Sequence, residues 1–352
     1  MVILNEAKPK YDKLNELLEP YLLDIRFSNQ VNIVIDLKEV LKKFFRPDIS
    51  IENSQKTLIE EISSDILNIV GHYRNYFYKN GKYTTFYFVY SFDKCDIMIS
   101  ENAEYKKEYY EKYLNNENQQ AVIAKKAAQV IERVCRNLPN VEFIESSKYD
   151  EFLVTKYLVS VFKQNELSII LTNDMIFHQL VYNQNVIILN LKGIKTELIN
   201  FKNVLNILSK KDDIQFSANL YPLVLSIAGV KKYSITSVPG CAINKAITII
   251  NRLVLNDKII DAPSVEVPIK FSELNSKDKL ENIIINNSEK IISNYEFIRG
   301  DKLYSRNRLG ITNATSTLEN KIPSMSVLKS INAKVFTMFP LQLEMILKGE
   351  RI

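Results

Sequence analysis

The sequence predicts an α/β fold with a mostly parallel central sheet and flanking helices, and two observations carry this prediction. Short apolar runs, rich in β-branched and aromatic residues, alternate with longer segments in which apolar residues recur at helical spacing. Several of the short runs also lead directly into an acidic residue. Alternation of this kind is typical of sheets covered by helices, in which ligands bind at the carboxyl ends of the strands.

The predicted elements follow one another in a regular order. Residues 31–36 (VNIVID) form a β-branched run, and the helical pattern LKEVLKKFF follows it directly until Arg46 and Pro47 end the helix. Residues 84–90 (TTFYFVY) give a second strand with aromatic and β-branched side chains. The remaining strands are expected at 141–144, 167–172 and 186–189, and the remaining helices at 14–22, 58–70, 123–134 and 150–162.

The composition excludes several classes of protein. A chain of 352 residues with 46% hydrophobic and 25% charged residues is typical of a globular protein with a full core. It has no apolar run of membrane-spanning length, and charge comes too early in its first residues for a secretory signal. We therefore expect a cytoplasmic protein without a membrane partner, in the host cytoplasm if the chain is viral.

The composition also limits which metal sites and which nucleic-acid contacts the chain can form. Three widely spaced cysteines favour reduced thiols over a disulfide framework. Two histidines are too few for a histidine-rich zinc site, so any metal would be held by oxygen ligands. A net charge of +5 and a pI near 8.8 are compatible with a nucleic-acid partner but do not require one.

Acidic residues follow the predicted strands or begin a predicted helix at four places. They are Asp36, Asp93, Asp150 with Glu151, and Asp174. Each alone has a structural interpretation, because an acid in a first helical turn caps backbone amides and complements the helix dipole. Together at one sheet edge they would repel one another unless a divalent cation neutralised them, and clustered oxygen ligands suit Mg²⁺ or Mn²⁺.

Five segments between residues 30 and 255 occur in a distinctive order: VNIVID, VYSFDKCD, KYDEFLVTKYL, TNDMIFHQLV and AGVKKYSITSVPGCAINKAITII. In this order they resemble the flap endonuclease and bacteriophage 5′-nuclease superfamily, whose core is related to PIN-type nucleases. The fourth is similar to that family's Gly-Asp-Lys-Asp-Phe-x-Gln-Leu-Val signature, and the fifth to its helix-three-turn-helix motif. The resemblance implies a PIN-like metal-dependent nuclease fold acting on DNA ends, flaps or branched duplex, as exonuclease or flap endonuclease. An unrelated doubly wound α/β protein is the alternative.

The resemblance also implies site residues. The catalytic and metal-binding candidates are Asp36, Asp93, Asp150, Glu151 and Asp174, with Ser91 as an alternative to Asp93. Ile176, Val230 and Tyr233 stand where the family has three further acidic ligands of one of its two metal sites. These side chains cannot coordinate Mg²⁺ usefully, so we expect one ion, Mg²⁺ or Mn²⁺, with Asp36 as its first ligand.

Two functions follow from the resemblance, and a third stands outside it. The protein is either a 5′-nuclease with a single divalent-metal site or a pseudonuclease that binds DNA, or serves as a scaffold, without cutting. Lys148 beside Asp150 favours the second function, because a cation near the cluster could substitute for a metal. The third is an α/β enzyme that does not act on nucleic acid.

The DNA contacts are expected in two regions. Gly240 lies in a turn before a helix whose free amides could meet a phosphate, and Lys231, Lys232 and Lys245 add charge around it. The resemblance implies that residues 97–122 form an arch, in which the candidate contacts are Lys106, Lys107 and Lys112. A helical hairpin with solvated lysines and an exposed charged helix are the structural alternatives.

The domain organisation has three parts. Residues 1–30 form an N-terminal helical extension, and residues 31–255 form the nuclease-like core, including the arch-like segment 97–122 and the helix hairpin 217–255. Residues 256–352 form a C-terminal extension with an expected strand at 264–271, an expected helix at 280–298 and a possible role in binding a protein partner.

Overall fold

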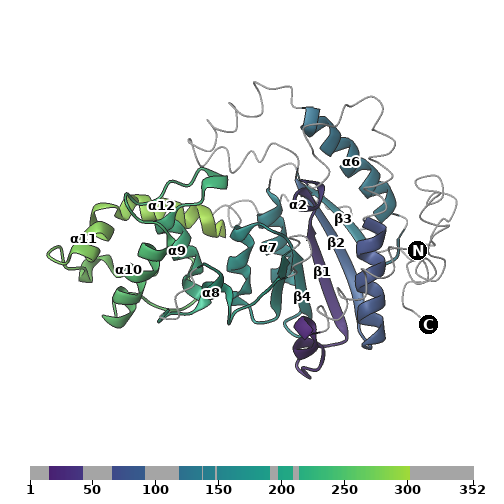
Figure 1. Ribbon diagram of the computed structural model, residues 1–352, viewed down its shortest axis with the longest axis horizontal. Coiled ribbons are helices and arrows are strands. Elements are labelled where there is room, and N and C mark those ends of the chain that lie inside the picture. Colours follow the sequence, from purple (N-terminus) through teal and green to yellow (C-terminus); the bar gives the residue numbers. More distant parts are fainter. Residues whose placement is uncertain are drawn as a thin grey trace.

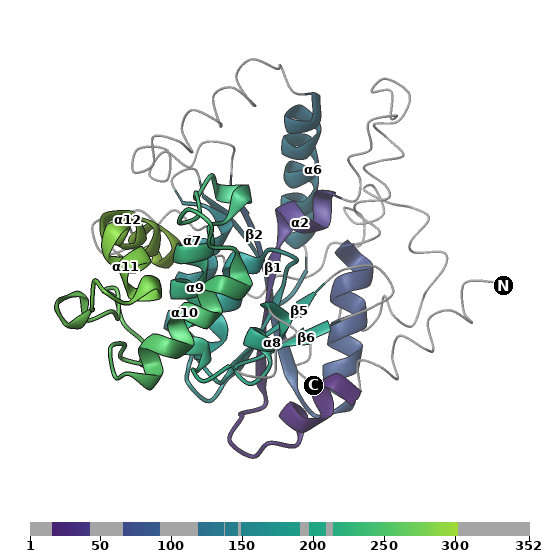
Figure 2. The same ribbon diagram turned by 60° about the vertical axis from the view of Figure 1, so that its left-hand side comes forward.

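The computed structural model describes residues 16–42, 66–91, 119–136, 138–146, 149–190, 197–208 and 214–301. A six-stranded sheet forms the centre of this part of the chain, with the strand order β3-β2-β1-β4-β5-β6. Figure 1 labels β1 to β4, and Figure 2 labels β5 and β6. The strands are β1 (Gln30–Asp36), β2 (Tyr83–Ser91), β3 (Val141–Ser146), β4 (Leu167–Leu171), β5 (Val186–Asn190) and β6 (Glu197–Ile199). All neighbouring strands are parallel except β5 and β6. The predicted mostly parallel α/β sheet is confirmed, whereas the short antiparallel edge strand β6 was not expected.

Helices cover both faces of the sheet, which explains why the central strands read as continuous apolar runs. Successive side chains of a strand point to opposite faces, so Ile33 and Ile35 of β1 pack in one hydrophobic cluster while Val34 packs in the other. The helical residues 66–79 and helix α6 (Gln119–Cys135) lie over the first face. Helix α7 (Glu151–Val161) and the helices that follow residue 214 lie on the opposite side of the sheet (Figures 1 and 2).

The other helical elements range from single 3₁₀ turns to the 13 residues of α10. They comprise residues 16–22, α2 (Leu37–Lys42), the 3₁₀ helix η1 (Met175–Tyr182), α8 (Val204–Leu208), η2 (Ala218–Leu220), α9 (Tyr221–Ala228), η3 (Lys231–Tyr233), α10 (Ile243–Leu255), η4 (Phe271–Glu273), α11 (Lys279–Asn286) and α12 (Ser288–Arg299). None of the helices within the described ranges is long and apolar enough to cross a lipid bilayer.

The described residues beyond 255 differ from the sequence prediction in two respects. The strand expected at 264–271 is wrong, because only an isolated bridge between Ile259 and Ile269 forms there. Pro268 lies in that segment and has no backbone N–H to extend a ladder. The helix expected at 280–298 is divided at Asn287 into α11 and α12.

Helix α12 fastens this C-terminal part to the rest of the molecule. It packs against α9, and its last carbonyls are bound by side chains of the core. The Gln179 side chain donates to the Ile298 carbonyl at 2.9 Å, and the Lys156 ammonium donates to the Arg299 carbonyl at 2.7 Å. These bonds satisfy carbonyls that a helix end leaves without intrahelical partners.

Candidate active-site edge of the sheet

The predicted acidic residues gather where the strand order reverses. From β1 the chain adds β2 and β3 on one side, then returns to place β4 and β5 on the other. Asp36 is the last residue of β1, and Asp174 follows β4, its neighbour in the sheet. In open α/β sheets this switch point, at the carboxyl ends of the strands, is where ligands bind.

The start of α7 brings two more carboxylates to the same edge. Asp150 is the N-cap of α7 and Glu151 is its first residue. All four acidic residues are buried, with exposed fractions of 3% for Asp36, 8% for Asp150, 6% for Glu151 and 5% for Asp174. Asp93 and Lys148 lie outside the described residues, so their expected positions stay predictions.

Thr172 connects Asp36 and Asp174. Its hydroxyl donates to Asp36 Oδ2 at 2.8 Å, and its oxygen accepts a bond from the Asp174 backbone N–H at 3.0 Å. The Glu39 backbone N–H lies 3.3 Å from Asp36 Oδ1. Both oxygens of Asp36 therefore have a donor inside the protein.

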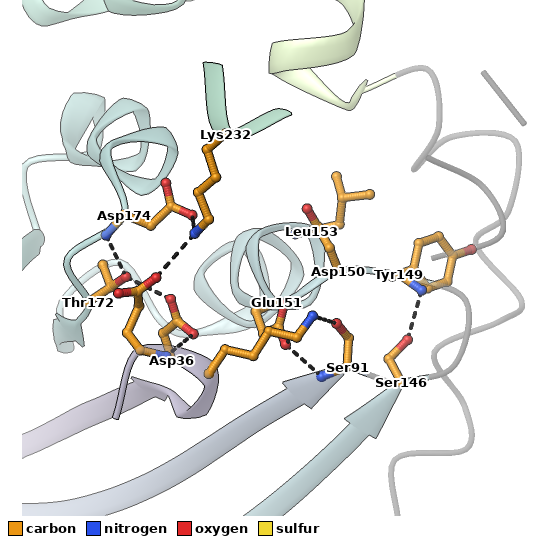
Figure 3. Close-up of polar contacts among 12 residues, drawn as sticks. Asp36, Ser91, Ser146, Tyr149, Asp150, Glu151, Leu153, Thr172, Asp174 and Lys232 are labelled. Carbon is orange, nitrogen blue, oxygen red and sulfur yellow. Dashed lines mark hydrogen bonds and ion pairs between the residues drawn. The ribbon is translucent and has the colours of Figure 1, made fainter. Parts of the chain in front are cut away.

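Glu151 is held by the end of β2 and by a lysine. The Ser91 backbone N–H donates to Glu151 Oε1 at 2.9 Å. The Lys38 ammonium lies 3.2 Å from the same oxygen and donates to Ser91 Oγ at 3.0 Å. Figure 3 shows Ser91 and Glu151 on the side of the site away from Asp174.

The two carboxylate oxygens of Asp150 have different environments: one caps a helix, and the other has no partner. Its Oδ1 accepts the Leu153 backbone N–H at 2.8 Å, which is an N-cap bond of α7. Its Oδ2 is buried and has no hydrogen-bond partner in the structure. A buried carboxylate oxygen without a donor costs free energy unless a proton or a cation meets it.

Both carboxylate oxygens of Asp174 accept hydrogen bonds from other groups of the protein. Its Oδ1 accepts the Ile176 backbone N–H at 3.1 Å. Its Oδ2 accepts the Tyr233 hydroxyl at 2.6 Å and also a bond from the Lys232 ammonium. Lys232 stands directly opposite Asp174 (Figure 3) and binds Glu39 Oε1 at 3.1 Å as well.

The site's electrostatics follow from burial and from charge crowding. Burial, followed by the charge of Glu151, raises the pKa of Asp36 to about 7. Burial also raises the pKa of Asp150 to about 7, although its N-cap bond opposes the rise. Burial alone would lower the pKa of Lys232, but the charges of Asp174 and Glu39 outweigh that effect and raise it.

The arrangement does not form a metal centre among the residues that the structure describes. No three acidic, histidine or cysteine side chains in those ranges are grouped so that they could hold a metal ion. Ile176 and Val230 are apolar and buried at two of the expected ligand positions, and Tyr233 occupies the third. The groups around Asp174 are an ammonium and a hydroxyl, which donate hydrogen bonds to its carboxylate. They do not provide the oxygen ligands that a divalent ion needs.

A tight turn carries Lys232 and Tyr233 to the site. Gly229 ends α9 with φ 75° and ψ 163°, a backbone conformation open essentially only to glycine. A Cβ on Gly229 would lie 2.6 Å from the Ile235 carbonyl oxygen. The backbone of Val230 pairs with that of Ile235 across η3, which closes the turn.

The segment expected from the sequence to contact DNA folds as α9, η3 and α10, and its contact with DNA stays a prediction. Gly240 has φ 69°, and α10 begins after Ala242 without a side-chain cap. Gly240 and Lys245 are exposed at this helix start, and Lys231 is exposed in η3, while the Lys232 ammonium is bound by Glu39 and Asp174. Lys106, Lys107 and Lys112 lie outside the described residues.

Sequence reasoning missed three residues that shape the site. They are Lys38, Glu39 and Thr172. Each carried a positional signal, because Thr172 directly follows β4 and the other two lie in the first turn after Asp36. Their partners, however, are set by tertiary contacts that a linear pattern does not reveal.

No protein-family model and no curated protein matches this chain. Its structure is nevertheless similar to that of the flap endonuclease of bacteriophage T5, solved as a pseudo-enzyme in which lysine replaces an aspartate, in a product complex with DNA and metal ions. That match has 12% identity and a TM-score of 0.55, and covers 87% of this chain and 99% of the T5 chain. The T5 5′-exonuclease with bound zinc matches with 12% identity and a TM-score of 0.57, over 88% and 99% of the two chains. The chain therefore has a flap endonuclease type of PIN-like fold, and the predicted fold is confirmed.

Proposed function

We propose that this protein binds DNA ends, flaps or branched duplex through a 5′-nuclease-like fold and does not hydrolyse them. The proposal rests on one observation above all: both oxygens of Asp174 are engaged by protein donors, one of which is the Lys232 ammonium. A carboxylate satisfied in this way has little to offer a metal ion. The protein is then a pseudonuclease, a DNA-binding or scaffold protein.

The loss of hydrolysis follows from the chemistry that two metal ions supply. Two-metal nucleases use one ion to activate water and the other to stabilise the leaving oxygen of the phosphodiester. The positions at which the resembling family has further acidic ligands hold Ile176, Val230 and Tyr233, none of which supplies a carboxylate. An ammonium can neutralise charge, but it cannot lower the pKa of a bound water as a metal ion does.

Binding of DNA is supported by the part of the fold that lacks such losses. The start of α10 presents backbone N–H groups without a side-chain cap, which is a favourable position for a phosphate. Lys245 in the first turn of α10 and Lys231 in the preceding η3 are both exposed and add positive charge. The T5 flap endonuclease, which has this fold, was solved with DNA. Contacts of this kind bind duplex without reading its sequence.

A nuclease with one divalent ion is the second candidate, and a specific observation favours it. Asp150 Oδ2 is buried without a partner, next to Glu151 and near the charge of Asp174. A single Mg²⁺ or Mn²⁺ at this half of the edge would need a ligand from outside the described residues, such as Asp93, in addition to Asp150 and Glu151. Under this alternative, Lys232 replaces only the second ion.

The deciding experiment measures binding and cleavage of the same 5′-labelled flap and of a blunt duplex. The wild-type protein is incubated with each substrate in EDTA, Mg²⁺ or Mn²⁺, and Asp36→Asn serves as the site variant. We expect salt-dependent binding under all three conditions and no product. Metal-dependent product that Asp36→Asn abolishes would establish the single-metal nuclease instead.

The binding surface is tested separately. Lys245→Ala should weaken flap binding and reduce its salt dependence by about one ion, whereas Lys277→Ala, an exposed lysine before α11, should leave both unchanged. Equal loss in the two variants would mean that the start of α10 is not the contact surface. Absence of salt-dependent binding in the wild-type protein would refute the nucleic-acid function altogether.

A further inference from the structure

The ammonium of Lys232 lies among three carboxylates that come from three different elements. It donates to Asp174 Oδ2 after β4 and to Glu39 Oε1 in α2 at 3.1 Å. The charge of Asp36 at the end of β1 acts on it as well. The Asp174 and Glu39 side chains are only 2% and 7% exposed, so solvent screens their charges weakly.

We propose that Lys232 is a built-in counter-ion that takes the electrostatic place of a divalent ion at this edge of the sheet. The affinity of the protein for DNA is then independent of metal ions. The part that concerns DNA rests on the proposed function; the part that concerns the charge stands on the geometry alone. Because the cation is covalently attached to the chain, it cannot be removed by a chelator.

The turn that carries Lys232 is built so that its position is fixed. Gly229 permits a close approach of the chain to Ile235 and Ser237 that no side chain would allow. The Val238 backbone N–H donates to the Ile227 carbonyl at 2.8 Å, which ties the far end of the turn back to α9. The backbone that carries Lys232 is therefore already ordered in the free protein, so its conformational entropy is not lost again when DNA binds.

Tyr233 is the second group that occupies the Asp174 carboxylate in place of a metal ion. Its ring is buried, and its hydroxyl donates to the same Asp174 oxygen at 2.6 Å. Burial and the charge of Asp174 raise the pKa of this hydroxyl well above its usual value, so it stays a donor. A metal ion approaching Asp174 would have to displace both donors.

The lysine is also open enough to meet a ligand. Its side chain is 47% exposed, in contrast to its buried partners. A DNA phosphate next to Asp36, Glu39 and Asp174 would be repelled by their charges, and the ammonium reduces that repulsion. Removal of the ammonium should therefore create a need for a soluble cation, and Mg²⁺ can bind through one or two carboxylates with water in its other positions.

The test compares Lys232→Gln with wild type, Lys232→Arg and the exposed control Lys277→Gln. Thermal unfolding is measured in EDTA and in millimolar Mg²⁺, and flap binding is measured under the same two conditions. Mg²⁺ should raise the Tm of Lys232→Gln by about 3 °C and leave the other three proteins within about 1 °C. In EDTA the Lys232→Gln variant should bind the flap about tenfold more weakly, because the positive charge that offsets the carboxylates is lost, and Mg²⁺ should restore most of that loss.

The outcomes separate this inference from the proposed function. If no protein binds the flap but the Tm pattern holds, the proposed function fails and the counter-ion stands. If Mg²⁺ stabilises wild type as much as Lys232→Gln, or if flap binding by wild type requires Mg²⁺, the counter-ion is refuted.

A second variant keeps the test decisive if Lys232→Gln misfolds. If Lys232→Gln does not fold, the double variant Lys232→Gln/Asp174→Asn, which removes both charges of the pair, should fold. Failure of the double variant to fold would mean that Lys232 serves packing rather than charge, and would overturn the proposal.

Discussion

Replacing Gly229 with alanine should destabilise the protein strongly, because this glycine shapes the turn that carries Lys232. Its backbone, at φ 75° and ψ 163°, lies in a region essentially restricted to glycine, and such strain costs about 1–3 kcal/mol. The added Cβ would also meet the Ile235 carbonyl oxygen and the Ser237 nitrogen at 2.6 Å, both of them backbone atoms that cannot rotate away. Forced repacking of this kind costs about another 1–3 kcal/mol.

Urea denaturation followed by circular dichroism measures the loss. Gly229→Ala should lower the free energy of unfolding by about 2–6 kcal/mol, seen as a lower urea midpoint at an unchanged slope. Gly81→Ala is the matched control, since Gly81 also has a positive φ, 69°, but no atom lies within 4 Å of the position that its added methyl group would take. The control should lose only the backbone term of about 1–2 kcal/mol. Equal losses in the two variants would refute the argument from the close approach.

Two further predictions concern the carboxylates. In EDTA the protein should be more stable near pH 5 than near pH 8, because the pKa values of Asp36 and Asp150 are raised to about 7 in the folded protein and lie near 3.9 in the unfolded chain. The folded state binds more protons between these values, so stability falls as pH rises from about 4 to about 7, by a few kcal/mol in total; denaturation curves that show stability rising over this interval would contradict the raised values. Thr172→Val should cost about 1–3 kcal/mol, because it leaves Asp36 Oδ2 and the Asp174 backbone N–H without their common partner, whereas Thr172→Ser should cost much less. A calorimetric comparison in which valine and serine behave alike would show that the hydroxyl is unimportant.

The sequence predicted the sheet and its acidic edge because both depend on local pattern. Strands buried on both faces give unbroken apolar runs, and residues at their carboxyl ends necessarily meet at one edge. Asp36 and Asp174 were placed correctly for this reason. The segment 264–271 shows the limit of such patterns, because alternating valines suggested a strand that has no partner strand to pair with in the described part of the chain.

The way in which the edge is neutralised could not be predicted from the sequence. The ion pair between Lys232 and Glu39 joins residues 193 positions apart, and it depends on how η3 approaches α2. From the sequence, Lys232 was one of several lysines around a presumed DNA-binding turn, and Lys148 was the expected substitute cation. Only the packing of α9 and its turn against the sheet edge assigns Lys232 to Asp174.

The most direct test of a metal-independent, non-cleaving DNA-binding protein is one titration of wild-type protein onto a 5′-labelled flap, carried out in EDTA and in Mg²⁺. The samples are read both for bound complex and, after denaturation, for product. We predict the same affinity within about twofold in both conditions and no product, since Lys232 supplies the cation at Asp174. Cleavage that appears only with Mg²⁺, and is lost in Asp36→Asn, would contradict this conclusion.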